Sequence, residues 1–372
     1  MYMSRNKFLA FLVLTFLTCS VIGAQTQRDW WYTLERGKQM FRQGDYGSAL
    51  LAFEDARRQR RTMYERLERH LINLLSITEV RRIGDSLDLV ERYIGERHYA
   101  DAAEAIAELY YRIPKESLHN SAAAALTALG TLKDYPEAEY WIGETYLIEG
   151  ELRLAQSQFQ KAYDLRQFLE NPGFATELLY KIAAICRTRK DYNEMERNLL
   201  AILSEDKLWS GGGAFEKQAL TRVLENNGIE RFLTLYRYRD TESELAHRLL
   251  GLFYYTSGRH SRAQEHLMFS FLIQNTVIIE EVIRNRYDFT FTTLEALAVE
   301  INRYPLLVDY AAKNEYYKTA YYLGASLYGN GKTPAARELW TFLSAQSAAG
   351  EWQARAAGQL RNPHVERLVE MP

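Results

Sequence analysis

The segment Gly329-Asn330-Gly331-Lys332-Thr333 contains the residues best suited to chemistry, because Gly-Lys-Thr closes the loops that hold nucleotide phosphates. The complete pattern needs another glycine five residues before Gly331, and Ser326 stands there. No strand is predicted before the segment, whereas a turn between two helices accounts for Gly331. We therefore interpret this segment as a turn and not as a phosphate site.

Other reactive side chains also fit helical packing better than catalysis. Gly324-Ala325-Ser326-Leu327-Tyr328 resembles the start of a nucleophile elbow, but Tyr328 replaces the required last glycine. His260 and His266 are the closest histidines in the sequence, and they lack the companions of a zinc motif. Cys186 occupies an apolar position of a helical pattern, which predicts a buried, inert thiol. We expect no catalytic residue, no metal ion and no cofactor.

The composition predicts a folded chain with a large core. Of the 372 residues, 47% are hydrophobic and 25% are charged, with a formal net charge of -2. This balance gives no electrostatic attraction for a polyphosphate backbone, so nucleic acid is not expected as a partner. The 26 tyrosines supply large contact areas with polar tips, which suit protein-binding surfaces.

The first 24 residues form a predicted secretory signal. Arg5 and Lys7 precede the apolar run 8–17, and small residues lead to Ala24 before Gln25. The apolar run is shorter than the roughly twenty residues that a membrane-spanning helix needs. The protein is therefore expected to be exported and periplasmic, with membrane contact only through this segment.

Cys19 provides an alternative end to the same segment. As a lipidation site it would anchor the mature chain to a membrane facing the periplasm, although Phe16-Leu17-Thr18 fits a lipoprotein signal poorly. If the signal is instead cleaved after Ala24, Cys186 is the one cysteine left, and an intramolecular disulfide is excluded.

One pattern recurs four times along the chain. It consists of a glycine, a large residue three positions later, a second glycine, and then an alanine followed four positions later by a large apolar residue. The copies are Gly37, Met40, Gly44, Ala49 and Phe53; Gly143, Tyr146, Gly150, Ala155 and Phe159; Gly251, Tyr254, Gly258, Ala263 and Leu267; and Gly324, Leu327, Gly331, Ala336 and Trp340. Two weaker copies comprise Tyr93, Tyr99, Ala102, Ile106 and Pro114, then Ile182, Ala183, Cys186, Asp191, Tyr192 and Leu199.

This pattern resembles the tetratricopeptide repeat (TPR), a pair of antiparallel helices that pack closely at a small residue. The resemblance implies an all-α fold, an irregular TPR-like α-solenoid in which helix hairpins form a right-handed superhelix. Tyr135-Pro136-Glu137-Ala138 leading into Tyr140-Trp141-Ile142-Gly143 resembles repeats of periplasmic division-associated and outer-membrane-assembly proteins. That likeness covers a single repeat.

The copies are unevenly spaced, so further helices must lie between them. We expect these helices at 62–76 (as a continuation of the preceding helix), 118–132, 215–225, 229–238, 280–286 and 292–301, with a terminal capping helix at 351–360. Val277-Ile278-Ile279 would also permit a short strand. Ser210-Gly211-Gly212-Gly213 predicts a flexible joint between an N-terminal array, 25–209, and a C-terminal array, 210–372.

The resemblance also implies a binding surface, because first-helix residues of such repeats line a concave face. The residues expected on this face or beside it are Phe41, Tyr140, Leu147, Tyr180, Arg187, Arg248, Tyr255, Lys318, Tyr321 and Tyr328. Arg187 and Lys318 are the cations expected beside it. Aromatic anchors with a few cations suit a peptide that carries carboxylates. The alternative is that these rings are buried by additional helices. We expect a non-catalytic scaffold or adaptor that binds a protein or peptide partner.

Overall fold

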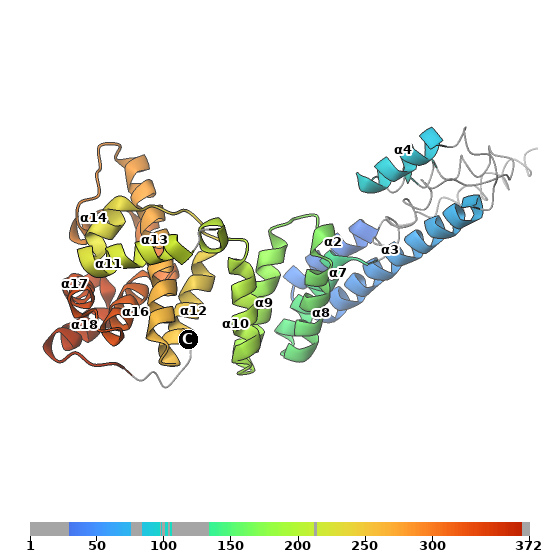
Figure 1. Cartoon of the computed structure of the whole chain (residues 1–372). Coiled ribbons are helices and arrows are strands. Elements are labelled where there is room, and N and C mark those ends of the chain that lie inside the picture. The colour runs from blue at the N-terminus through green and yellow to red at the C-terminus, as the bar shows by residue number, and fades with distance from the viewer. Residues whose placement is uncertain are drawn as a thin grey trace, which may run out of the picture. The chain divides into compact units, whose positions relative to one another are not determined.

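The computed structural model describes residues 30–75, 84–96, 98, 101–102, 105, 134–211 and 214–366, and every regular element within them is a helix (Figure 1). The all-α prediction is confirmed for this part of the chain. Two compact units form, Met1–Leu178 and Leu179–Pro372, so the boundary expected at 209/210 falls inside the second unit. The signal segment, Cys19 and the helix expected at 118–132 lie outside the described residues.

The first unit is built from helix hairpins. Its elements are α2 (Trp30–Arg42), α3 (Tyr46–Leu75), α4 (Gly84–Gly95), α7 (Pro136–Ile148), α8 (Leu152–Asp164) and the short η1 (Arg166–Phe168). Helix α9 (Phe174–Thr188) begins in the first unit and ends in the second.

The second unit continues with helices of more varied length. They are α10 (Tyr192–Leu203), η2 (Lys207–Gly211), α11 (Ala214–Leu235), α12 (Glu244–Thr256), α13 (His260–Asn285), α14 (Leu294–Arg303), α15 (Pro305–Lys313), α16 (Tyr316–Gly329), α17 (Thr333–Ser344), η3 (Ser347–Ala349) and α18 (Glu351–Arg361).

Four hairpins, α2/α3, α7/α8, α12/α13 and α16/α17, leave no room for a side chain at the first glycine of the recurring pattern. A Cβ atom at Gly37 would lie 2.5 Å from Phe53, and one at Gly143 would lie 2.6 Å from Phe159. The corresponding distances are 2.5 Å from Gly251 to Leu267 and 2.9 Å from Gly324 to Trp340. No side chain fits at such separations, so the predicted close approach at a small residue is confirmed in all four hairpins.

The second glycine of each copy ends the first helix of its hairpin. In the first hairpin Gly44 has a φ of 82°, its N–H donates to Phe41 O at 3.0 Å, and Asp45 N–H donates to Met40 O at 3.0 Å. These two bonds define a Schellman turn, which favours glycine because the backbone is left-handed. Lys190, with a φ of 60°, makes the same turn between α9 and α10 without a glycine.

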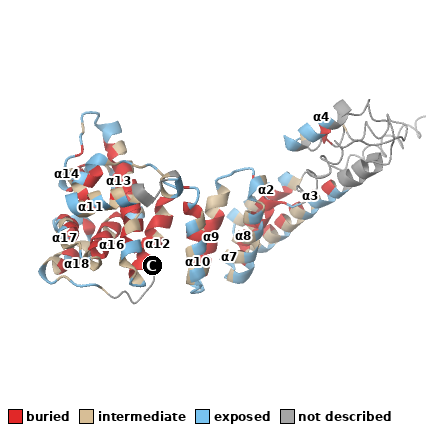
Figure 2. Cartoon of the chain, in the orientation of Figure 1, coloured by how far each residue is buried: buried red, intermediate tan, exposed pale blue. Residues whose placement is uncertain are grey.

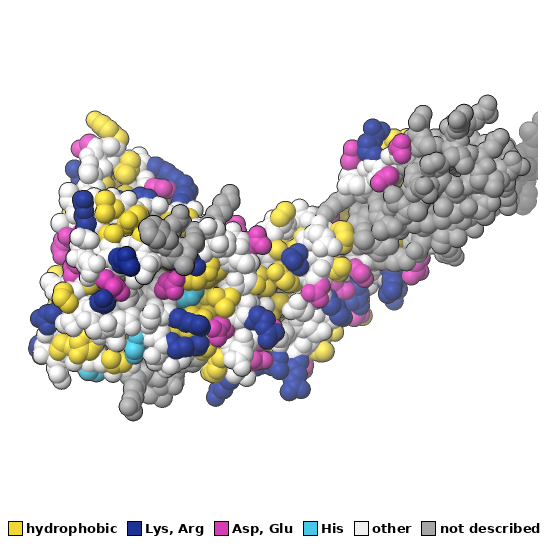
Figure 3. All heavy atoms as spheres, viewed as in Figure 1, with side chains coloured by type: hydrophobic (Ala, Val, Ile, Leu, Met, Phe, Trp, Pro, Cys, Tyr) yellow, Lys and Arg dark blue, Asp and Glu magenta, His cyan; other side chains and the backbone are white. Residues whose placement is uncertain are grey.

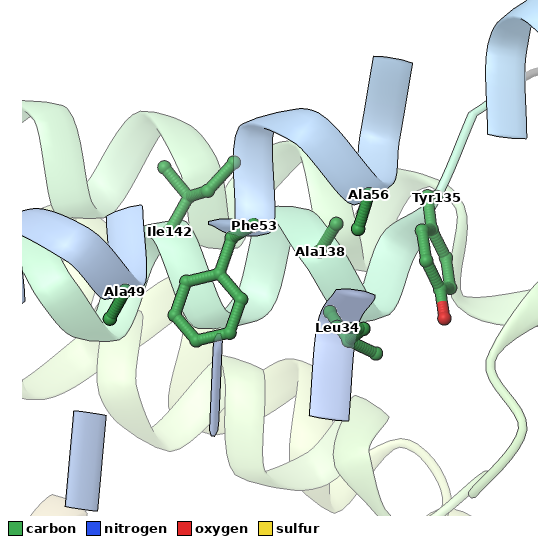
Figure 4. Packing of buried hydrophobic residues seen from close by; sticks show 7 residues of the cluster. All are labelled: Leu34, Ala49, Phe53, Ala56, Tyr135, Ala138 and Ile142. Atoms are coloured by element: carbon green, nitrogen blue, oxygen red, sulfur yellow. The ribbon is translucent and has the colours of Figure 1, made fainter. Parts of the chain in front are cut away.

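The core of the first unit joins its two hairpins (Figure 4). Its fully buried members are Leu34, Ala49, Phe53, Ala56, Tyr135, Ala138 and Ile142. Helix α3 is continuous over 30 residues, as predicted for 62–76, and packs against α7. The first two strong copies are therefore in direct contact. Of the weak copy expected between them, Tyr93 lies on α4, whereas Tyr99, Ile106 and Pro114 lie outside the described residues.

Helix α13 is the central helix of the second unit and packs against α11, α12, α14 and α16. By length and composition it could cross a membrane, but 78% of its apolar window is buried within the protein, which is typical of a core helix. Figure 2 shows this burial along most of α13. The short strand that residues 277–279 would permit does not form, because α13 continues to Asn285.

Helix α11 bends at Gly228, where φ is 82° and ψ is 172°. The bend separates the two helices predicted at 215–225 and 229–238, although the second ends at Leu235 and residues 236–238 are not helical. Glu338 of α17 accepts hydrogen bonds from the N–H groups of Ile229, at 3.1 Å, and Glu230, at 3.4 Å. A carboxylate at this position satisfies the free amides that begin the second half of the helix. Helix α14 likewise confirms the helix expected near 292–301.

Replacement of Gly143 by alanine tests the close approach of α7 and α8. The new methyl group would overlap Phe159, so we expect Gly143→Ala to lower the free energy of unfolding by about 1–3 kcal/mol in urea denaturation. Gly47→Ala in α3 is the control, because no atom lies within 4 Å of the added Cβ. Equal stability of the two variants would show that the glycine contact does not limit helix packing.

Candidate peptide-binding surface

The predicted binding residues of the first unit are used mainly in its own packing. Phe41 is half-buried and meets Trp141 edge-on, with ring centroids 5.4 Å apart, and Leu147 is also half-buried. Tyr140 is 5% exposed, stacks on Phe174 at 5.0 Å and donates to Glu177 at 2.5 Å. The first turns of α9 therefore cover Tyr140, and its hydroxyl is already bonded.

Tyr180 and Arg187 lie on the part of α9 that belongs to the second unit. The hydroxyl of Tyr180 donates to Glu242 O at 2.5 Å and accepts from Ala246 N–H at 3.0 Å. It thus bonds to one of the amides that begin α12. Arg187 is half-buried. The tyrosine fixes the start of α12, a role that its position in the repeat did not reveal.

Arg248 is buried within a polar network between α12, α13 and α16. Its guanidinium pairs with Glu244 at 3.2 Å and with Glu315, and Glu315 also pairs with Lys318 at 2.8 Å. Burial would raise the pKa of Glu315, but Lys318 and Arg248 together lower it below its usual value. Arg248 and Lys318 are consequently paired with carboxylates inside the unit. Lys318 and Glu315 also line an open pocket of about 300 Å³ with Trp352.

Three predicted tyrosines, Tyr255, Tyr321 and Tyr328, converge on one extended piece of chain, residues 363–366, which we call the tail segment. The tail segment follows α18 and turns back towards α16 and α12 (Figure 1). Tyr328 donates to Pro363 O at 3.2 Å, and Tyr255 accepts from Glu366 N–H at 3.1 Å. Tyr321 donates to the Glu366 carboxylate. The structure therefore brings these three rings together around a bound extended segment.

Helix α18 completes this surface with residues that the sequence analysis did not select. Arg355 donates to Glu366 and, at 3.2 Å, to the hydroxyl of Tyr322. Gln359 accepts from His364 N–H at 2.9 Å. Trp352, Arg355 and Gln359 are three and four residues apart, which places them on one face of a helix. This spacing in the sequence indicates a shared helix face, which the prediction of a terminal capping helix at 351–360 does not include.

A second polar cluster lies entirely inside the second unit. His247 and His266 approach at 3.1 Å between their Nδ1 atoms, and Asp206 lies 3.5 Å from His247 Nε2. Because the Asp206 carboxylate faces Nε2, we assign the His247 proton to Nε2 and the shared Nδ1 proton to His266. The three residues are no more than 3% exposed, so a substrate cannot reach them. The sequence had singled out His260 with His266, but the partner of His266 is His247.

The other chemical motifs occupy the positions predicted for packing. Gly331 lies in the turn between α16 and α17, Ser326 is buried within α16, and Cys186 is buried with its pKa raised to about 11 by burial. The described residues contain no group of three His, Cys, Asp or Glu side chains placed to hold a metal ion. On the face seen in Figure 3, basic and acidic side chains of the described residues are interspersed.

The histidine pair makes stability depend on pH. Burial lowers the pKa of both imidazoles. His247, Lys217 and Arg262 lower the pKa of His266 further, although Asp206 raises that of His247. The unfolded chain takes up these protons near pH 6.5. The contribution of the neutral histidines to the free energy of unfolding should therefore be fully present above that pH. Below it, the free energy of unfolding should fall by up to about 1.4 kcal/mol per pH unit for each histidine.

His266→Phe removes one of these groups and keeps a ring in contact with Trp209. We expect urea unfolding between about pH 7 and pH 5 to show a weaker pH dependence for this variant than for the parent chain. An unchanged dependence would mean that the pair does not control acid sensitivity.

No family model matches the chain. A protein of Treponema pallidum (strain Nichols) is 25% identical over 335 residues, which is 89% of this chain and 90% of that protein. It is named only as an uncharacterized protein. The similarity thus extends over nearly the full length of both chains, and the relative's name assigns no activity.

Proposed function

We propose that the chain is a non-catalytic scaffold or adaptor of the bacterial cell envelope, in which TPR-like hairpins bind an extended segment of a protein partner. The shared glycine register of four hairpins supports the TPR-like solenoid, and similarity to a protein of Treponema pallidum supports a bacterial source. The predicted signal at 1–24 supports export.

One observation carries the binding proposal: Tyr255, Tyr321 and Tyr328 hold an extended chain by their hydroxyl groups. Two of these hydrogen bonds go to main-chain atoms, at 3.1 and 3.2 Å. Main-chain bonds give affinity for any extended peptide, and the side chains that fit beside them give specificity. The rings themselves are buried or half-buried, so the hydroxyl groups are positioned by packing before a ligand arrives.

The compartment can be tested on the mature protein. Mass spectrometry of the N-terminus should find Gln25, free or cyclised, if the protein is a soluble periplasmic adaptor. An acylated Cys19 would instead support the alternative, a lipid-anchored subunit of envelope assembly or of a transporter. An intact Met1 would contradict export by either route.

Partner binding can be tested with a variant that keeps all three rings. Tyr255→Phe, Tyr321→Phe and Tyr328→Phe together remove three hydroxyl groups, each worth about 0.5–1.5 kcal/mol in a hydrogen bond. The comparison is made in a Glu366→Ala chain, in which the tail segment is held less firmly, and we expect the triple change to lower the recovery of cross-linked partners from the envelope at least about tenfold. Tyr287→Phe, at a ring that is 93% exposed, is the control. Undiminished recovery with the folded triple variant would contradict a binding role for this surface.

A further inference from the structure

The tail segment is bound at a site whose parts come from three helices. Tyr255 belongs to α12, Tyr321 and Tyr328 to α16, and Gln359 to α18. Tyr321, Tyr255 and Gln359 are 0%, 2% and 1% exposed. The two tyrosine rings also pack against residues outside the tail segment: Tyr321 lies 5.4 Å from Trp352, and Tyr255 lies 5.2 Å from Tyr322, between ring centroids. These contacts within the second unit position the tyrosine hydroxyl groups.

Main-chain atoms of the tail segment receive three of the contacts. Tyr328 donates to Pro363 O at 3.2 Å, Gln359 accepts from His364 N–H at 2.9 Å, and Tyr255 accepts from Glu366 N–H at 3.1 Å. Side chains between these anchor points remain outside the site, because His364 is exposed and Val365 is 43% exposed. The site therefore contacts the main chain of an extended segment and does not select the side chains at the positions of His364 and Val365.

The side chain that the site does recognise is a carboxylate. Tyr321 and Arg355 both donate to Glu366, and the Gln359 amide lies 3.4 Å from the same group. Arg355 is surrounded by aromatic rings, with centroids 4.6 Å away for Trp352 and 4.9 Å for Tyr321. These rings stabilise the cation by cation–π attraction and hold the guanidinium in one orientation. A charge-assisted bond to a fixed arginine favours an acidic side chain over its neutral amide.

We infer that this site binds an extended peptide bearing an acidic side chain, and that in the free protein the tail segment occupies it as an internal competitor. This inference rests on the proposed function and specifies its ligand. A partner segment must displace the tail segment, whose effective concentration at the site is on the order of millimolar. The apparent affinity for a partner is therefore reduced by the fraction of sites that the tail segment fills.

The probe is a synthetic peptide, Asn-Pro-His-Val-Glu, labelled with fluorescein at its N-terminus and amidated at its C-terminus, so that glutamate is the only carboxylate of its peptide part. The receptors are the full chain and its Glu366→Ala variant, compared by fluorescence anisotropy with protein up to about 1 mM. We expect Glu366→Ala to bind the probe about tenfold more tightly than the parent, because loss of the carboxylate weakens the competitor.

Two further comparisons test the chemistry of recognition. In the Glu366→Ala chain, a second change, Arg355→Gln, should weaken probe binding about tenfold or more, and a probe with Gln in place of Glu should lose a similar factor. Arg361→Ala is the matched control: Arg361 belongs to the same helix, is exposed, and bonds locally to Ala357 O. It should leave the affinity unchanged. Circular dichroism verifies that each receptor is folded.

The inference is overturned if the folded Glu366→Ala chain does not bind the probe, or binds it no better than the parent does. It is also overturned if the glutamine probe binds equally well. These outcomes are distinct from failure of the proposed function. If the probe binds but no partner depends on the three tyrosine hydroxyls, the scaffold role is refuted and the proposed peptide recognition stands. If partners depend on the hydroxyls but the probe does not bind, the scaffold role stands and the proposed peptide recognition is refuted.

Discussion

Both units depend on one steric constraint, the close approach of paired helices at a residue with little or no side chain. Phe159 occupies the space that a Cβ of Gly143 would need, and Leu267 and Trp340 do so at Gly251 and Gly324. Such contact excludes water from the line where two helices meet and leaves the remaining faces for other helices. In the first unit that remaining face joins α3 to α7, where Arg57 also binds Glu139 through two bonds of 3.0 and 3.1 Å.

The tyrosine-rich surface follows from the same packing. A tyrosine in the first helix of a hairpin can bury its ring between helices and still present its hydroxyl at the edge. Tyr255 and Tyr321 do this in the second unit, where the hydroxyls meet the tail segment. Tyr140 is also buried and Tyr180 is half-buried, but their hydroxyls meet Glu177 and the start of α12. Tyrosines on first helices thus serve different purposes, according to what covers each hairpin.

Buried polar groups add specificity to this packing. Glu244 accepts from Arg248, from Ser270 at 2.8 Å and from Gln274 at 2.7 Å, which joins α12 to α13 in one arrangement. Asp206 accepts from two main-chain amides of η2 at 2.9 Å, as well as from Tyr238, and faces His247. Its pKa is held at about 2, because these hydrogen bonds outweigh the effect of burial. Breaking either cluster would leave buried charges without partners, a cost that disfavours alternative packings.

The sequence by itself determined the features that depend on neighbours along the chain. Apolar spacing gave the helices, the glycines gave the close approaches and turns, and Gly228 gave the bend in α11, because each follows from local geometry and the volume of one side chain. Tertiary structure alone decided what each helix face would meet. Glu366 and Tyr255 are 111 residues apart, and no local pattern couples the Glu366 carboxylate to Arg355 and Tyr321, or the main chain of the tail segment to Tyr255 and Tyr328. Contacts of that kind depend on how α12, α16 and α18 pack together, which local sequence does not determine.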